Sequence, residues 1–352
     1  MLSSPSYEPS DQHTPEISVI VLNWNGKRFL EACLEGLRRQ SFRDFETILV
    51  DNGSSDGSVE YVRSNFPEVR VLALPDNRGF AGGNIAGYEQ STGNLILLLN
   101  NDTEAHPKWL EEIRDASLTY PQAGSFASKM MYFDERNRVE NCGFDVGIEG
   151  ATLDLGRDQY DGPQWSKPRE VFGACAGAAA YRRTMLEDVG FLDDDFFMTY
   201  EDVDLSFRAQ LRGYSCVYVP GAIVYHRYRA TNSKLPDRQV FYSQRNIEYV
   251  WVKNMPFALI VRSAPWRLLY ELGAAIYFIR VGTGSAFLKS KWAVLRNFSS
   301  LLRKRKEIQG RRVARNAEMQ EKLHNSIFGI KWRKLRAAWS GATGGTTIGF
   351  TP

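Results

Sequence analysis

Apolar and polar positions in the N-terminal half of the chain alternate in blocks that predict strands and helices joined by short links. Short apolar runs predict strands, and apolar residues at helical spacing between them predict helices. The expected strands are 17–22, 46–50, 69–74 and 95–99, and the expected helices are 27–39, one through Val59 and Val62, and 79–90. This alternation is typical of a mainly parallel sheet with helices on both faces.

Beyond residue 125 the periodicity weakens, and order is harder to read until a second block at 172–225. This block contains a small-residue segment at 173–180, a helix at 184–189, an acidic helix beginning near Glu201 and a strand at 215–219. Small side chains at 173–180 either leave room for a ligand or allow close strand packing, and both readings stay open.

Polar clusters follow the apolar runs. They are Asp51–Asp56 after the second strand, Asn100–Asp102 after the fourth, and Glu201–Asp204 at the acidic helix. In α/β enzymes the ligands bind at the carboxyl ends of parallel strands, so these clusters are the candidate chemistry of the chain.

Charge is unevenly distributed along the 352 residues, whose formal net charge is +3. Residues 289–336 hold 15 Lys or Arg against 3 Glu, which is +12 and leaves −9 for the rest. A basic region on an acidic body favours an anionic surface as its partner, although solvated helix faces are also often basic. A nucleic-acid partner is not expected, because the body is acidic.

Cysteine usage and hydropathy give an expectation for location. The four cysteines form no CxxC pair, so we expect reduced structural thiols. Residues 1–15 lack a basic start and an apolar core, so no secretory signal is expected. The longest charge-free apolar stretch near the C-terminus, 272–279, is too short to span a bilayer, and a cytoplasmic location follows.

Residues 256–340 predict a basic amphipathic helical appendage. One helical face carries an apolar stripe, made of Trp266, Leu269, Tyr270, Gly273, Ile276 and Tyr277. Basic helices with aromatic residues bind anionic membrane surfaces, so we expect peripheral attachment to the inner face of the cell membrane. Packing on the catalytic domain, or in a homo-oligomer, is the alternative. The expected organisation is a disordered tail at 1–15, a main domain at 16–255, the appendage at 256–340 and a flexible tail at 341–352.

Six motifs carry a family resemblance because they occur together and in order. They are Ile20–Gly26, Val50–Asp56, Asn77–Asn84, Asn100–Asp102, Phe196–Asp204 and Val224–His226. Through them, residues 17 to about 255 resemble the family 2 glycosyltransferases of the GT-A fold, and within these the rhamnosyltransferase-like group. The resemblance implies an α/β nucleotide-sugar-binding fold with a mainly parallel, Rossmann-like mixed sheet, followed here by the helical appendage.

The resemblance also implies a nucleotide site. Its residues would be Asn23, Trp24, Asn25, Asp51, Arg78 and Asn101. Asp51 would accept a hydrogen bond from a uracil or thymine base, Trp24 would stack on the base, and Arg78 would meet the diphosphate. Each has an alternative: an Asx turn for Asp51, a core position for Trp24 and a surface salt bridge for Arg78.

A divalent cation, Mg²⁺ or Mn²⁺, is implied between Asp102, His226 and the donor diphosphate. The chain departs from the family's acidic DxD motif, because Asn100 stands where the first acid is expected. This departure leaves the identity of the metal open. A buried structural histidine is the alternative for His226.

Asp202 is the candidate general base, because an inverting transfer needs a carboxylate to take the proton of the acceptor hydroxyl. Val203, Phe207 and Leu211 would form one apolar stripe of its helix and leave the carboxylates on the other side. The helix N-terminus would favour the ionised form. Helix capping is the alternative for Asp202, and Asp204 is expected to pair with Arg208.

The predicted function is inverting transfer of a sugar in bacterial cell-surface glycan synthesis, with dTDP-L-rhamnose as the first candidate donor. The acceptor would be a lipid-linked saccharide or a growing polysaccharide. UDP-hexoses and UDP-galactofuranose are alternative donors. Because the first acid of the metal motif is missing, a non-catalytic nucleotide-binding scaffold is the alternative from another class.

Overall fold

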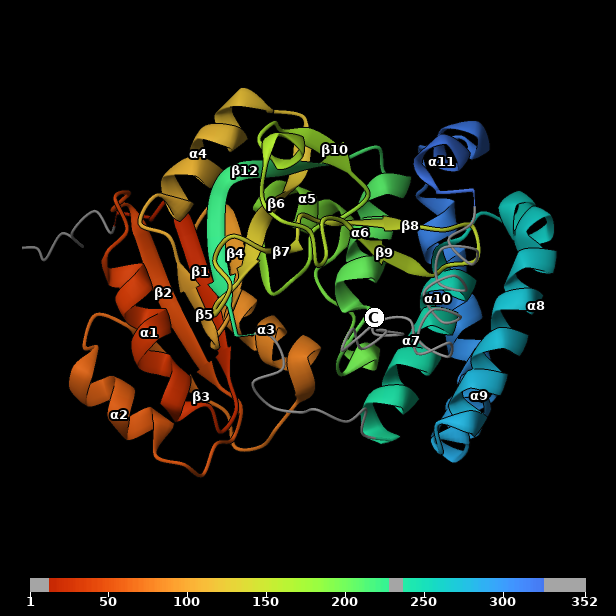
Figure 1. The fold of residues 1–352 in the computed structure, drawn as a ribbon, viewed down its shortest axis with the longest axis horizontal. Helices are drawn as coiled ribbons and strands as arrows, with labels where there is room; N and C mark the ends of the chain where they lie inside the picture. The colour runs from red at the N-terminus through yellow and green to blue at the C-terminus, as the bar shows by residue number, and fades with distance from the viewer. Residues whose placement is uncertain (1–12, 228–236, 326–352) are drawn as a thin grey trace, which may run out of the picture.

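The computed structural model describes residues 13–227 and 237–325, which are built around one large mixed sheet (Figure 1). The strands are β1 (Ile17–Asn23), β2 (Phe45–Asp51), β3 (Arg70–Ala73), β4 (Leu95–Asn100), β5 (Thr103–Ala105), β6 (Ala123–Tyr132), β7 (Val139–Asn141), β8 (Phe144–Val146), β9 (Thr152–Asp154), β10 (Arg169–Val171), β11 (Ala178–Arg182) and β12 (Ser215–His226). They lie in the order β10-β12-β6-β11-β4-β1-β2-β3, with β5 on β12 and β7 on β6. β8 and β9 form a separate pair.

The strands β3, β2, β1 and β4 are parallel, as predicted. The other end of the sheet is mixed, because β11 runs antiparallel between β4 and β6. The expected α/β fold with a mainly parallel N-terminal sheet is therefore confirmed. Residues 1–12 of the predicted N-terminal tail, 326–340 of the basic region and the predicted tail at 341–352 lie outside the described residues.

Helices cover both faces of the sheet (Figure 1). They include α1 (Lys27–Arg38), α2 (Ser58–Asn65) and α4 (Trp109–Thr119) on one face and α3 (Gly79–Gln90), α5 (Arg183–Val189) and α6 (Glu201–Leu211) on the other. In β1, Val19 and Val21 join the core beneath α1, whereas Ile20 joins the core with Ala81 of α3. Alternate residues of a strand point to opposite faces, so both faces of β1 are buried.

The two longest strands, β6 and β12, differ from the sequence prediction. The ten-residue strand β6 was not predicted, because its sequence holds buried Ser125, Ser128 and Lys129 and no β-branched residue. Its pairing with β11 and β12 overrides this weak local preference. β12 continues past the predicted end at residue 219, through a register shift between Val219 and Ile223. The shift allows one strand to reach His226.

The C-terminal helices pack on the main domain, and such packing was one of the two alternatives for the region at 256–340. They are α7 (Asp237–Asn254), α8 (Phe257–Arg280), α9 (Gly284–Arg296), α10 (Phe298–Gly310) and α11 (Asn316–Lys322), and they share one core with α6. Lys291 pairs with Glu248 at 2.5 Å, and Lys304 pairs with Asp195 at 2.6 Å. Part of the excess positive charge is therefore paired with acidic side chains of the same molecule.

The predicted apolar stripe of α8 is divided between a buried side and an exposed side of the helix. Tyr270 is buried, whereas Trp266, Leu269 and Ile276 are exposed. The helix instead buries a line that includes Ser263 and Arg267, which hydrophobicity does not reveal. No helix within 13–227 or 237–325 is long and apolar enough to cross a membrane.

Candidate active site

The polar clusters meet at one edge of the sheet because three neighbouring parallel strands end together. Asn23 at the end of β1 is the register partner of Asp51 at the end of β2, and Leu22 is the partner of Asn100 at the end of β4. The strand-end position predicted for the N-terminal clusters is therefore confirmed.

Three of the candidate nucleotide residues form one hydrogen-bonded row. The Asn101 amide donates to Asn23 Oδ1 at 2.7 Å, and the Asn23 amide donates to Asp51 Oδ1 at 3.0 Å. Asp51 Oδ2 accepts the backbone N–H of Ser54 at 2.9 Å, three residues on, which is one residue beyond the Asx turn considered as the alternative. The Asp51 side chain is nearly buried, at 2% exposed, and is fixed from two sides.

The loop after β1 presents Trp24 to solvent. Its side chain is 51% exposed, so the core alternative for this tryptophan is wrong. The following residue, Asn25, has a φ of 50° and accepts the backbone N–H of Ser55 at 2.9 Å. Its own N–H donates to Ser54 Oγ at 2.8 Å. Asn25 therefore shapes the loop.

The glycines at the start of α3 allow close packing against protein backbone. A Cβ on Gly79 would lie 2.3 Å from the Phe197 carbonyl oxygen, which accepts the N–H of Phe80 at 2.5 Å. Arg78 precedes this helix, and its side chain is 49% exposed, with Nε 4.0 Å from Asp76 Oδ1. The surface ion pair proposed as its alternative is present at the limit of ion-pair distance, and the guanidinium remains accessible to a ligand.

Asp102 and His226 are adjacent, although 124 positions separate them in the sequence. β12 pairs with β5, which places His226 opposite Thr103, and His226 Nε2 lies 3.2 Å from Asp102 Oδ1. On the other ring nitrogen, Nδ1 lies 2.8 Å from Glu140 Oε2. Burial lowers the pKa of His226, but the Glu140 and Asp102 carboxylates outweigh burial and raise it to about 10.

This arrangement would suit a cation that takes only some of its ligands from protein and that displaces the Nε2 proton of His226 when it binds. A histidine that binds a metal through one nitrogen commonly bonds a carboxylate through the other, and Glu140 is placed for that role. Within residues 13–227 and 237–325, no group of three or more His, Cys, Asp or Glu side chains is arranged to hold a metal. The sequence analysis did not identify Glu140, because this residue lies on a short strand beyond residue 125, where the periodicity is weak.

Asp202 begins α6 close to the strand-end cluster. Its Oδ2 accepts the N–H of Ala176 at 3.1 Å, and the next residue, Gly177, accepts the N–H of Asn100 at 2.9 Å. Burial raises the pKa of Asp202 to about 6, even though hydrogen bonds from the Ala176 and Val203 amides oppose the rise. The predicted preference of the helix N-terminus for the ionised form is therefore outweighed by burial.

The neighbouring acids of α6 have different environments. Glu201 is buried, its Oε2 has no hydrogen-bond partner among the described residues, and burial together with Asp202 raises its pKa well above the usual range. Asp204 pairs with Arg208 at 2.9 Å, as predicted. The helix is more extensively buried than the predicted apolar stripe requires. Every residue of α6 except Asp202 is buried.

A strained turn leads into α6. Phe197, Thr199 and Tyr200 have φ values of 57°, 64° and 68°, in the left-handed region that is costly for residues with a side chain. The Asn246 amide on α7 donates to the carbonyls of Phe196, Met198 and Thr199 at 2.9, 2.8 and 2.7 Å. Asn246 therefore holds the turn that positions Asp202, a role that the sequence did not indicate.

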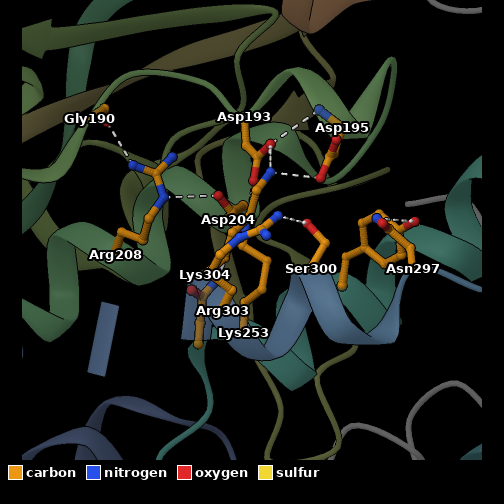
Figure 2. Close-up of polar contacts among 12 residues, drawn as sticks. Gly190, Asp193, Asp195, Asp204, Arg208, Lys253, Asn297, Ser300, Arg303 and Lys304 are labelled. Atoms are coloured by element: carbon orange, nitrogen blue, oxygen red, sulfur yellow. Dashed lines mark hydrogen bonds and ion pairs between the residues drawn. The ribbon is translucent and has the colours of Figure 1, made fainter. Parts of the chain in front are cut away.

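A buried ionic network ties the same segment to the C-terminal helices (Figure 2). Lys304 of α10 lies 2.7 Å from Asp193 and 2.6 Å from Asp195. Lys253 of α7 contacts Asp193 and lies 3.0 Å from Asp204. The C-terminal helices therefore hold in place the segment that precedes Asp202.

The small-residue segment packs as a central strand. Ala178, Ala179 and Ala180 are buried in β11 between β4 and β6. A Cβ on Gly177 would lie 3.2 Å from the Asn100 amide nitrogen. Close strand packing explains the composition, and a floor beneath a donor sugar remains a prediction.

Comparison with known proteins gives the family. Residues 18–190 match the family described as Glycosyl transferase family 2. An uncharacterised protein of Sinorhizobium fredii, y4gI, is 28% identical over 252 residues, which cover 67% of this chain and 27% of that protein. The N-acetylglucosaminyl-diphospho-decaprenol L-rhamnosyltransferase of Mycobacterium tuberculosis is 25% identical over 249 residues, or 63% of this chain and 80% of that relative.

A solved structure supports the fold. GalNAc-T7, determined with UDP, GalNAc and Mn²⁺, superposes with a TM-score of 0.55 at 15% identity, over 69% of this chain and 48% of that chain. The likeness is one of fold, and it agrees with the mixed sheet and strand-end site described above. Through residues 18–190 the chain belongs to glycosyl transferase family 2, and it is a transferase enzyme of the GT-A fold.

Proposed function

We propose that the enzyme is an inverting glycosyltransferase that uses a nucleotide-sugar donor, with dTDP-L-rhamnose as the first candidate. The observation that carries the proposal is a carboxylate with a pKa of about 6, Asp202, beside the strand ends that hold Asp51 and Asp102. The relative from Mycobacterium tuberculosis, named as an L-rhamnosyltransferase, supports the choice of sugar. UDP-hexoses and UDP-galactofuranose are the alternative donors.

The nucleotide would bind along the row at the ends of β1 and β2. Asp51 would accept a hydrogen bond from the base imide, and the exposed Trp24 would stack on the base. Asn23, Asn25 and Asn101 would keep this surface in shape through their hydrogen bonds. Arg78, exposed at the edge, would reach the diphosphate.

Asp102 and His226 would hold a divalent cation, Mg²⁺ or Mn²⁺. Bound there, the cation would neutralise charge on the leaving diphosphate. Glu140 would orient His226 through Nδ1. The solved GalNAc-T7 structure contains Mn²⁺, which is consistent with a divalent cation in this fold.

Asp202 would perform the proton transfer. The acceptor hydroxyl oxygen forms a bond to the anomeric carbon, the bond from that carbon to the diphosphate oxygen breaks, and the diphosphate leaves with the electron pair. The hydroxyl proton moves to Asp202, which must be ionised beforehand. Because attack and departure occur on opposite sides of the carbon, the configuration inverts and no covalent enzyme intermediate forms.

The acceptor and the location belong to the same proposal. We propose a lipid-linked saccharide or growing polysaccharide as acceptor, reached by an enzyme attached to the inner face of the cell membrane. The name of the Mycobacterium tuberculosis relative includes a diphospho-decaprenol acceptor, which supports a lipid-linked substrate. Attachment would be peripheral and would use the basic C-terminal region.

A thermal-shift panel with dTDP, UDP, GDP and ADP, each with and without Mn²⁺ or Mg²⁺, tests the donor site. A ligand that binds only the folded protein raises its melting temperature. We expect stabilisation by dTDP or UDP in the presence of metal. Absence of a shift with all four nucleotides would contradict the proposal.

The Asp202→Asn variant tests the base. We expect sugar transfer to fall by about 10²–10⁴-fold, while the nucleotide-induced shift in melting temperature is retained. Glu201→Gln is the matched control, because a carboxyl group that is already neutral loses little when it becomes an amide. Full activity in Asp202→Asn would remove this residue from the mechanism.

A further inference from the structure

One side of α8 exposes apolar residues along the length of the helix. The helix lies at the edge of the molecule, far from the sheet (Figure 1). Phe257 is 72% exposed, Val261 and Leu268 are each 61% exposed, and Ile279 is 64% exposed. The exposed apolar residues of this helix are Phe257, Val261, Trp266, Leu268, Leu269, Leu272, Ile276 and Ile279. Soluble monomers seldom expose so many neighbouring apolar side chains without a partner.

The helices that follow add to this surface. Trp292 of α9 is 63% exposed and Leu295 is 65% exposed, and α10 exposes Phe298 and Leu302. We refer to the exposed apolar residues of α8 as the outer face. Its buried side contacts the rest of the protein through residues such as Leu259, Tyr270 and Phe278, so the outer face lies outside the core.

The charged residues that α8 and α9 place beside the outer face are mainly positive. From residue 257 to residue 306, the sequence contains one acidic residue, Glu271. Its carboxylate is paired with Arg267 at 2.7 Å and Lys291 at 2.5 Å. Arg262 and Arg280 are exposed near the two ends of α8.

A basic hollow opens at the beginning of α8. It has a volume of about 560 Å³ and is lined by Phe257, Ala258, Leu302, Arg305, Lys306, Gln309, Arg312 and Asn316. Arg305 is fixed by donating to the carbonyls of Val252 and Met255 at 2.6 and 2.7 Å. Among the described residues no acidic side chain lines the hollow, and Phe257 belongs to both the hollow and the outer face.

We propose that the outer face of α8 and the basic hollow together form a docking surface for an anionic phospholipid bilayer. Apolar side chains would enter the boundary between headgroups and acyl chains, and Arg305, Lys306 and Arg312 would receive a headgroup phosphate. A free phosphate would account for the hollow but not for the apolar face. The inference rests on the proposed membrane location and is independent of the transfer chemistry.

Charge argues against a second copy of the chain as the occupant. In a two-fold dimer the same patch meets itself. Such a dimer would bring the cations of both hollows and the Arg262 and Arg280 side chains near like charges, with Glu271 already neutralised. A bilayer that contains anionic lipid offers opposite charge and an apolar interior together.

Co-sedimentation of the full chain with vesicles tests the apolar part. The vesicles would be phosphatidylcholine with and without phosphatidylglycerol. The triple variant Leu268→Gln, Leu272→Gln and Ile279→Gln should reduce partitioning onto phosphatidylglycerol vesicles by at least about tenfold. Leu118→Gln is the control, because Leu118 lies on α4 and is also well exposed, at 60%.

The Lys306→Gln variant tests the hollow. Partitioning onto vesicles that contain phosphatidylglycerol should fall about fivefold, with no change on neutral vesicles. Lys108→Gln, which removes an exposed cation before α4, should bind as the unmodified chain does. An equal loss on neutral vesicles would contradict a headgroup role for the hollow.

Three results would overturn the docking surface. One is unchanged vesicle binding by the triple variant, and another is failure of the unmodified chain to bind any vesicle. The third is a dimer, seen by sedimentation velocity without lipid, that the triple variant converts to monomer. Nucleotide-induced thermal shifts on the same samples separate these failures from failure of the donor site, because they need no membrane.

Discussion

The two sides of the candidate site are held in place in different ways. On the nucleotide side, Asn23, Asp51 and Asn101 lie on neighbouring strand ends and bond to one another directly. On the general-base side, Asp202 follows a strained turn that is held by Asn246 of α7. The first side depends on the sheet, and the second depends on helices that come later in the chain. The C-terminal helices therefore contribute to the candidate site as well as to the surface.

The largest expected effect is a loss of fold stability when the ionic network next to the general-base side is broken. Lys253 is 1% exposed and contacts both Asp193 and Asp204. Lys253→Met should destabilise the fold by about 3–5 kcal/mol, because carboxylates would remain buried with fewer cations. Chemical denaturation measures the loss.

The matched change on the nucleotide side should cost much less. Ser54→Ala removes two neutral hydrogen bonds, from the Asn23 amide at 3.3 Å and the Asn25 N–H at 2.8 Å. We expect a loss of about 1 kcal/mol, measured in the same way. Equal losses in the two variants would break the comparison between a locally held side and a remotely held side.

Asn246→Asp should lower kcat by about tenfold to 10²-fold through misplacement of Asp202, with little change in the donor KM. The reason is that a carboxylate oxygen replaces the amide donor that now meets three carbonyl oxygens. Steady-state kinetics with varied donor separates kcat from KM.

Asn297→Asp is the control for this variant, because the Asn297 amide donates to the Tyr249 hydroxyl at 3.1 Å rather than to the turn. It should leave kcat nearly unchanged. A rise in donor KM with unchanged kcat in Asn246→Asp would show that Asn246 acts on the donor instead of on Asp202.

The smallest expected effect on the kinetics comes from the loss of the exposed tryptophan on the nucleotide side. Trp24→Ala should raise the donor KM by roughly fivefold to tenfold and leave kcat nearly unchanged, because stacking on the base is equal before and during reaction. Trp292→Ala, which removes another exposed tryptophan, should have no effect on transfer to a soluble acceptor. A fall in kcat alone for Trp24→Ala would contradict a stacking role.

The same division explains what the sequence predicted. The elements β1 to β4 and α1 to α3 were anticipated within a few residues, since strand–helix alternation is a local pattern. The Asp102–His226 pair was implied by the family resemblance, and pairing of β5 with β12 brings the two residues together.

The general-base side could not be predicted in the same way. The turn at Phe197–Tyr200 is strained, and its support comes from Asn246, nearly 50 positions later in the sequence. Glu140 lies on a three-residue strand without a local signal. The raised pKa of Asp202 follows from burial against the rest of the fold, whereas sequence reasoning considered only the helix N-terminus.

The pH dependence of kcat/KM tests the central claim most directly, because Asp202 must be ionised to accept the proton and kcat/KM reports the pKa of the free enzyme. With the pKa of Asp202 raised to about 6, kcat/KM should fall about tenfold per pH unit below that value and level off above it. Glu201→Gln should keep the same limb, since Glu201 is already neutral. A flat profile between pH 5 and 7, or a limb that disappears in Glu201→Gln, would contradict the assignment of Asp202 as the base.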